Sequence, residues 1–164
     1  YQAELVTDGV LAQSERDNQR LWRYREGISE AISPRTPYKH DLSVNIHQAP
    51  AFLRAVDELV SRMASDAEVI WFGHIGDGNV HLNILRPIDQ PIAAFKASCE
   101  PLGDAIMSVV QEFSGSVSAE HGVGLLKKRY LQYTRSSAEI DQIKVLKQAL
   151  DPLGVMNPGK ILDL

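Results

Sequence analysis

Two short apolar segments joined by an Asp-Gly pair constrain the fold of this chain more than any other feature. Residues 69–75 and 80–85 are rich in aliphatic side chains, and Asp77-Gly78 lies between them. Asp-Gly in this position is the strongest short-range signal for a β-hairpin. A two-residue loop at Asp77-Gly78 would place His74 directly opposite His81. Directly opposed residues share a face, with Cβ atoms roughly 4.5–5.5 Å apart, so the two imidazoles are expected to lie side by side.

The elements around this hairpin predict an α+β fold. Residues 38–46 alternate between apolar and polar side chains, as in a half-buried strand. From there the order is β-α-β-β-α-β, the ferredoxin-like arrangement, an antiparallel sheet in the order 4-1-3-2 with both helices on one face. The remaining elements of this prediction are helices at 3–32, 49–65, 91–113, 123–133 and 137–150, and a fourth strand at 115–119. The last helix opens with Ser136 and Glu139, which form a capping-box pattern.

Length and composition favour one domain with an ordinary core. The 164 residues are expected to form a helical lead-in at 1–37, the βαββαβ core at 38–122, and C-terminal helices and a tail at 123–164. The net charge of −4 and the absence of a basic run argue against nucleic acid as a partner. Cys99 is the one cysteine, so no internal disulfide forms. The expected location is the cytoplasm, with the periphery of a membrane as the alternative.

Several chemically active side chains are predicted to meet at one edge of the sheet. Because strand side chains alternate, Lys39, Asp41 and Asn83 are expected on the face that carries both histidines. Glu120 follows the predicted fourth strand and reaches the same edge by leaning across the first strand. Two histidines and one carboxylate form the ligand set of catalytic zinc and of non-haem iron. The sequence therefore predicts a metal site made by His74, His81 and Glu120.

Two other classes of protein stay open at this point. A histidine in a strand is more often a hydrogen-bonded structural residue than a ligand, so a non-catalytic metal- or ligand-binding module is one alternative. An RNA-binding ferredoxin-like domain is another, but it needs exposed aromatic side chains and a basic sheet face. The histidine face offers little of either beyond Phe72. A Rossmann domain is excluded because no strand–GxGxxG–helix unit is present.

Three motifs, in order along the chain, resemble one known family. They are Gly73-His74-Ile75-Gly76-Asp77-Gly78-Asn79-Val80-His81-Leu82-Asn83, then Ser118-Ala119-Glu120-His121-Gly122-Val123-Gly124 followed by Lys127-Lys128, then Asp151 to Lys160. Trp22, Arg25-Glu26 and Lys39-His40-Asp41 match as well. Together they resemble the C-terminal, substrate- and metal-binding domain of FAD-linked oxidases of the vanillyl-alcohol oxidase superfamily. Within it, the resemblance is to dehydrogenases of D-lactate, D-2-hydroxyglutarate and glycolate.

The resemblance implies a role for nine residues. His74, His81 and Glu120 would bind a divalent ion, zinc or manganese, and His121 would act as the catalytic base. Arg25, Ser29, Lys39 and Asn83 would bind the substrate, and Asn157 would approach the flavin ring. Family members often carry threonine where this chain has Ser29, which keeps the hydroxyl.

The resemblance also implies cofactors and partners. The parent enzyme would oxidise a small D-2-hydroxy acid to a 2-oxo acid by hydride transfer to FAD. No dinucleotide-binding sequence is seen here, so an FAD-binding domain outside this chain would hold most of the flavin, and the chain alone is expected to be colourless and inactive. A quinone, a cytochrome or an electron-transfer flavoprotein would accept the electrons. Homodimer formation, the metal and the particular hydroxy acid stay open.

Overall fold

The chain forms two compact units in a computed structural model, which describes residues 7–164. The first unit ends at Pro34 and the second spans Arg35–Leu164. The sequence placed the end of the helical lead-in three residues later, at residue 37. Part of the helix expected from residue 3 lies outside the described residues.

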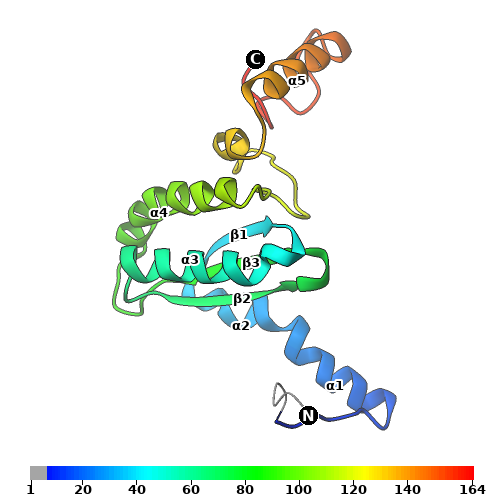
Figure 1. The fold of residues 1–164 in the computed structure, drawn as a ribbon, viewed down its shortest axis with the longest axis vertical. Coiled ribbons are helices and arrows are strands. Elements are labelled where there is room, and N and C mark those ends of the chain that lie inside the picture. The colour runs from blue at the N-terminus through cyan, green and yellow to red at the C-terminus, as the bar shows by residue number, and fades with distance from the viewer. Residues whose placement is uncertain (1–6) are drawn as a thin grey trace. The chain divides into compact units, whose positions relative to one another are not determined.

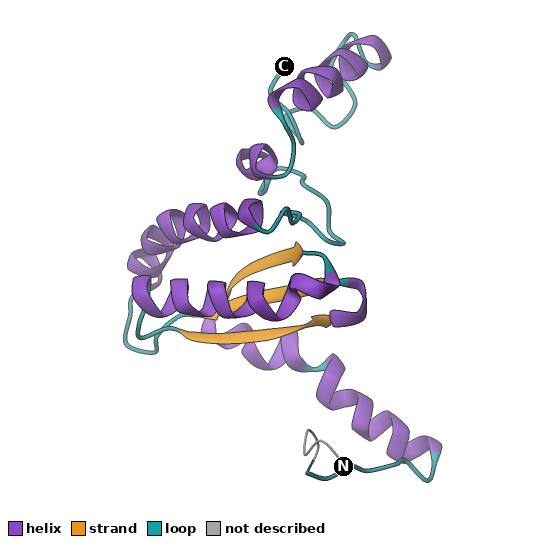
Figure 2. Ribbon diagram, in the orientation of Figure 1, coloured by secondary structure: helices purple, strands orange, loops and turns teal. Residues whose placement is uncertain are grey.

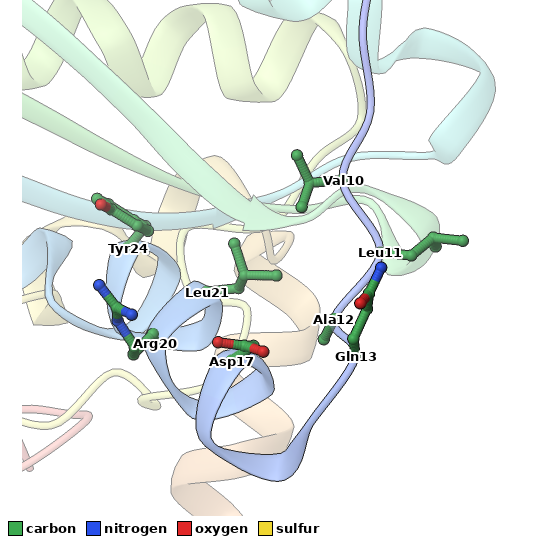
Figure 3. A pocket seen from close by; sticks show the side chains of 8 residues that line it. All are labelled: Val10, Leu11, Ala12, Gln13, Asp17, Arg20, Leu21 and Tyr24. Atoms are coloured by element: carbon green, nitrogen blue, oxygen red, sulfur yellow. The ribbon is translucent and has the colours of Figure 1, made fainter.

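The first unit contains two consecutive helices. α1 (Glu15–Glu26) begins after Ser14, whose hydroxyl accepts a hydrogen bond from the Asp17 N–H at 3.1 Å, and α2 (Ile28–Ile32) follows Gly27. Residues 7–13 are not helical, so the described part of the predicted helix begins later than expected. Figure 3 shows this extended segment beside α1, where the two line a shallow hollow. Its lining residues are Val10, Leu11, Ala12, Gln13, Asp17, Arg20, Leu21 and Tyr24.

The second unit is built on a three-stranded antiparallel sheet. β1 (Tyr38–Ser43), β2 (Glu68–His74) and β3 (Asn79–Leu85) lie in the order β1-β3-β2, and Figure 2 shows them as orange arrows. This order agrees with the one predicted for the first three strands, and the α+β class is confirmed. The prediction of a fourth strand at 115–119 is wrong. Residues 115–119 make only an isolated bridge, Ser43 to Ser116, because the chain turns away once its N–H groups reach the side chain of Asp41.

Two long helices cover one face of this sheet. α3 (Ala49–Met63) and α4 (Ile92–Glu112) pack against each other and against the apolar face of the strands (Figure 1). Each aliphatic or aromatic side chain buried there contributes roughly 1.5–3 kcal/mol relative to leaving it exposed. The fully buried side chains of this core include Leu42, Phe52, Val56, Leu82, Ile84, Ile106, Met107 and Val110. The polar groups of the opposite face are therefore supported by a well-packed layer.

The C-terminal part of the second unit contains one 3-10 helix and one α-helix. A 3-10 helix, η4 (Lys128–Tyr133), replaces the α-helix predicted at 123–133. α5 (Ser137–Leu150) begins with the predicted capping box. The side chain of Ser136 accepts a hydrogen bond from the Glu139 N–H, and the side chain of Glu139 accepts one from the Ser136 N–H. Earlier in the described part of the chain, three further 3-10 turns are η1 (Ser33–Arg35), η2 (Ile46–Gln48) and η3 (Ile75–Asp77). No helix within residues 7–164 has the length and apolar character needed to cross a bilayer.

Candidate functional site

The hairpin that carries the two histidines has a different register from the predicted one. His74 pairs with Asn79, and His81 pairs with Phe72, so the histidines are diagonal neighbours rather than directly opposed. The loop has four residues, because η3 forms a 3-10 turn closed by the Gly78 N–H to the Ile75 carbonyl. Relative to the prediction the register is shifted by two residues. A shift of two keeps every side chain on its face, so both histidines still share one face.

Two glycines in this hairpin explain its register. Gly78 adopts the left-handed conformation, with φ 68°, and a Cβ there would collide with the carbonyl oxygen of Val44. Gly73 has φ 154°, and a Cβ there would meet the carbonyl of Asn79 on the paired strand. Only glycine accepts such conformations and close approaches without strain. The longer turn and the tight pairing beside His74 both depend on these positions.

His74, His81 and Glu120 do meet at one end of the sheet. The Nδ1 atom of His74 lies 3.2 Å from Glu120 Oε1, and the Nε2 atom of His81 lies 4.0 Å from Glu120 Oε2. Asn79 donates a short hydrogen bond to Glu120 Oε1, and its own buried Oδ1 has no hydrogen-bond partner among the described residues. Glu120 therefore links both strands of the hairpin, although it comes from a loop beyond α4.

Asp41 holds the loop that carries Glu120. Its Oδ2 atom accepts hydrogen bonds from the N–H groups of Ala119, Glu120 and His121 at 3.2, 3.1 and 3.0 Å. The ammonium group of Lys127 lies 3.2 Å from the same oxygen. Burial alone would raise the pKa of Asp41, but the N–H donors of His121 and Glu120 and the charge of Lys127 outweigh it and hold the pKa at about 2. The group is therefore a carboxylate at neutral pH.

The two neighbouring imidazoles face the same carboxylate. Nδ1 of His81 lies 3.6 Å from Asp41 Oδ1, and Nδ1 of His121 lies 3.5 Å from Oδ2. The rings of His81 and His121 are stacked, with centroids 5.7 Å apart. Burial lowers the pKa of His81, and the charges of Asp41 and Glu120 offset this in part. A neutral imidazole with its Nδ1 proton toward a carboxylate presents Nε2 as its free lone pair.

The predicted substrate residues of the sheet lie on the same face as the histidines. Lys39 pairs with Asn83 across β1 and β3, two positions from the pair formed by Asp41 and His81. Lys39 is exposed, as a substrate-binding cation should be. Asn83 is only 1% exposed, and its amide donates to the carbonyls of Ile70 and His81. Part of its hydrogen-bonding capacity is thus used within the sheet.

The other predicted residues lie away from this cluster in the sequence. Arg25 is in the last turn of α1 and Ser29 is in α2, both in the first unit, and neither lines its hollow. Asn157 is exposed in the turn after α5 and adopts a left-handed conformation, with φ 49°. The role of Asn157 near the flavin and the roles of Arg25 and Ser29 in substrate binding stay predictions.

The donor set at His74, His81 and Glu120 suits a divalent ion. Among residues 7–164, no three His, Cys, Asp or Glu side chains already converge in ligating geometry. However, two donor atoms bound to one tetrahedral zinc lie roughly 3.4 Å apart, and Glu120 lies 3.2 and 4.0 Å from the two histidines. Neutral imidazoles and a carboxylate are the donors that zinc prefers. The residue types therefore suit such an ion, and the binding of one stays a prediction.

The fold and the motifs agree with the family that the comparisons identify. The sequence profile of FAD linked oxidases, C-terminal domain, matches residues 1–161, and the chain belongs to this family. It is 51% identical over 156 residues to a D-2-hydroxyglutarate dehydrogenase of Stutzerimonas stutzeri (strain A1501), covering 95% of this chain and 34% of the relative. A D-2-hydroxyglutarate dehydrogenase of Xanthomonas citri pv. viticola is 48% identical over 158 residues, with 96% and 34% covered. A mitochondrial one from Bos taurus is 40% identical over 164 residues, with 96% and 28% covered. The chain thus spans about one third of the length of these relatives.

Sequence reasoning missed the group at the centre of the site. Asp41 was placed on the histidine face, but its hydrogen bonds to three consecutive N–H groups were not foreseen. The contribution of Asn79 to Glu120 and that of Lys127 to Asp41 were also missed. The available signal was the carboxylate of Asp41 on the same strand face as the histidines.

Proposed function

We propose that this chain is the substrate- and metal-binding part of an FAD-dependent dehydrogenase that oxidises a D-2-hydroxy acid to a 2-oxo acid. The observation that carries the proposal is the meeting of Glu120 and His121 with the histidines of the β2–β3 hairpin. The family membership supports FAD as the acceptor of the hydride. The names of the relatives favour D-2-hydroxyglutarate as the first substrate to test.

The proposed metal ligands are His74, His81 and Glu120. A divalent ion such as zinc or manganese would supply Lewis-acid stabilisation of negative charge on the substrate oxygen. Asn79 fixes one oxygen of Glu120, and Asp41 orients His81 through Nδ1, which leaves Nε2 toward Glu120. Partners of this kind set the orientation of metal-binding side chains.

The proposed base is His121. Its side chain is 66% exposed, and Asp41 lies near its Nδ1 atom. The carboxylate favours the proton on Nδ1, so Nε2 is the atom that accepts the proton of the substrate hydroxyl. The neighbouring residue Glu120 points to His74 and Asn79 instead, so adjacent residues serve different roles.

The proposed substrate groups are Lys39 and Asn83 on the sheet, with Arg25 and Ser29 from the first unit. Lysine and arginine are suited to carboxylate recognition. Two cations allow a second carboxylate on the substrate, as in 2-hydroxyglutarate. Asn157 is proposed to approach the flavin. An electron acceptor such as a quinone, a cytochrome or an electron-transfer flavoprotein, and a homodimer, complete the proposal.

The function is tested with the full-length parent protein. Flavin reduction is measured with lactate, glycolate, 2-hydroxyglutarate and malate, using D and L forms. We expect reduction by a D-2-hydroxy acid, with D-2-hydroxyglutarate fastest. Reduction by none of these acids, under conditions where dithionite reduces the flavin, contradicts the proposal.

The metal assignment has its own control within the chain. His81→Ala is expected to lose the divalent ion, and His47→Ala, an exposed histidine in η2, is expected to retain it. Metal content is measured by elemental analysis after purification without chelator. Full metal content in His81→Ala means that the ligand set is wrong.

The base is separated from the ligand by a pair of variants. His121→Asn is expected to slow flavin reduction by roughly 10²–10⁴-fold while the metal stays bound. Glu120→Gln is expected to lose metal and activity together. Loss of metal in His121→Asn would make His121 a ligand instead, and flavin reduction at the parent rate would remove it from the mechanism.

A further inference from the structure

We infer that Asp41 is the positioning residue of this site: one buried carboxylate holds the Glu120–His121 loop against the hairpin and orients both His81 and His121. The inference rests on the proposed function, because the groups that Asp41 positions are the proposed ligands and base. Asp41 itself is 3% exposed, so it acts through these neighbours rather than on the substrate.

The loop has no regular structure of its own to hold it. Residues 118–123 form neither helix nor strand. Three consecutive N–H groups, those of Ala119, Glu120 and His121, instead converge on one oxygen of Asp41, and the Ser118 hydroxyl adds a contact at 3.3 Å. A carboxylate that accepts several N–H donors is a strong, directional anchor. The direction in which Glu120 and His121 leave the loop is therefore set by Asp41.

Lys127 makes the anchor a charged one. Its ammonium group bonds the Asp41 carboxylate, the main-chain carbonyl of Asp41 at 3.0 Å and the Ser118 hydroxyl at 3.2 Å. The side chains are 4% exposed for Asp41 and 15% for Lys127. An asparagine at position 41 would keep one acceptor oxygen but lose the charge that balances this ammonium. Removing one member of a buried ion pair leaves the other uncompensated.

Each carboxylate oxygen also faces a different imidazole. Oδ1 lies near Nδ1 of His81 and Oδ2 near Nδ1 of His121. Both rings are thereby oriented with Nε2 away from Asp41, and in His81 this atom is the one that approaches Glu120. A ligand role for Asp41 itself is disfavoured, because the N–H groups, the Ser118 hydroxyl and Lys127 already occupy Oδ2, and the Glu120 N–H also lies 3.4 Å from Oδ1. Asp41 thus orients both a proposed metal ligand, His81, and the proposed base, His121.

The experiment compares full-length Asp41→Asn with Val56→Ala. Val56 is a fully buried residue of α3 outside the site, so its truncation lowers stability without touching the loop. Zinc affinity is measured by chelator competition, and kcat and KM are measured with the substrate established for the parent. Both variants are assayed at a temperature where circular dichroism shows them folded.

Asp41→Asn is expected to bind zinc roughly 10–100-fold more weakly, as for other partners of metal ligands. At saturating zinc, kcat is expected to fall by about 10²-fold, with KM changed less than about threefold since Asp41 does not touch the substrate. Val56→Ala is expected to match the parent in all three. Parent-like zinc affinity and kcat in Asp41→Asn would overturn the inference, as would equal losses in Val56→Ala.

Hydrogen exchange separates this inference from the proposed function. The amide protons of Ala119, Glu120 and His121 are expected to be protected in the metal-free parent and to exchange at least tenfold faster in Asp41→Asn. This holds whether or not the parent oxidises a hydroxy acid. Unchanged exchange refutes the anchor even in an active enzyme. If Asp41→Asn does not fold, Lys127→Gln is measured in the same way, and parent-like exchange and zinc affinity in that variant also refute it.

Discussion

The Glu120–His121 loop and the turn after α5 are each held by a buried aspartate paired with a lysine, yet the two differ in how far the chain must travel to make the contact. Asp41 accepts hydrogen bonds from N–H groups 78 to 80 residues later and pairs with a lysine 86 residues later. Asp151 accepts from Val155 and Met156, four and five residues later, and pairs with Lys147 four residues earlier. The first arrangement exists only when the sheet has formed, whereas the second needs little beyond the end of α5.

Because of this difference, we expect the Glu120–His121 loop to open only when the whole fold opens and the turn after α5 to open locally. Contacts between distant residues form and break with the whole fold, while local turns open on their own. The proposed ligand and base are carried by the loop of the first kind. The residue proposed to approach the flavin, Asn157, follows the turn of the second kind. We therefore expect the part of the proposed site that carries Glu120 and His121 to be rigid and the part that carries Asn157 to be more mobile.

The largest expected effect comes from replacing each of the two aspartates in turn. Asp41→Asn is expected to lower the free energy of unfolding by about 3–5 kcal/mol, because Lys127 is left buried without its partner. Asp151→Asn is expected to leave the global transition near that of the parent and to speed amide exchange at Val155 and Met156. Denaturant unfolding and hydrogen exchange measure the two effects. Equal losses of global stability would erase the distinction.

A second prediction concerns the opposite face of the same strand. Burial lowers the pKa of His40 to about 4, and the charge of Lys127 adds to the shift. The pKa of His40 is lower in the folded than in the unfolded protein. The free energy of unfolding therefore falls by about 3 kcal/mol as the pH is lowered from 6.5 to 4, because the unfolded chain binds the proton first. His40→Phe is expected to flatten unfolding free energy across this window. An unchanged slope in the variant would show that another group is responsible.

The third prediction isolates the carboxylate of Asp41 by pH. Its folded pKa of about 2 lies below the ordinary value of 3.8. The corresponding stability is complete above pH 3.8 and is lost as pH falls through 2, by about 2 kcal/mol. The window lies below that of His40, so acid titrations of His40→Phe and of the double variant with Asp41→Asn separate the two. The double variant is expected to lack the lower step.

The smallest effect is a local one. Ser136→Ala removes the hydroxyl that caps α5 and breaks its reciprocal bonding with Glu139. Loss of such a cap costs about 1 kcal/mol of helix stability. Hydrogen exchange is expected to increase in the first turn of α5, with no change at residues 119–121. Faster exchange at both places would mean that the C-terminal segment and the site are more tightly coupled than the contacts indicate.

What the sequence predicted well was set by neighbours along the chain. The capping box at Ser136 and Glu139 is correct because its atoms are three residues apart. The hairpin exists where Asp77-Gly78 indicated, but its turn has four residues, since Gly78 and not the pair takes the left-handed conformation. The error in register is even, so the faces of His74 and His81 were still correct.

What the sequence did not predict depends on main-chain groups far away. The residues that flank Asp41 in the sequence do not indicate that its carboxylate will accept hydrogen bonds from the N–H groups of residues 119–121. The same contact explains why residues 115–119 form a bridge rather than a strand. Likewise, the apolar pattern at 123–133 suggested an α-helix, whereas only Lys128–Tyr133 is helical, as a 3-10 turn.

The position of residues 116–119 beside β1 has a consequence for the order in which the protein is made. β1 is an edge strand of the sheet, and its outer side is bonded by Ser116 and Ala119 at Ser43 and Asp41. During translation, β1 leaves the ribosome long before this covering segment. Until then, its outer edge presents main-chain groups that another strand can pair with, the feature that promotes intermolecular aggregation. The segment that covers this edge and the loop that carries Glu120 and His121 are therefore synthesised together, after all three strands.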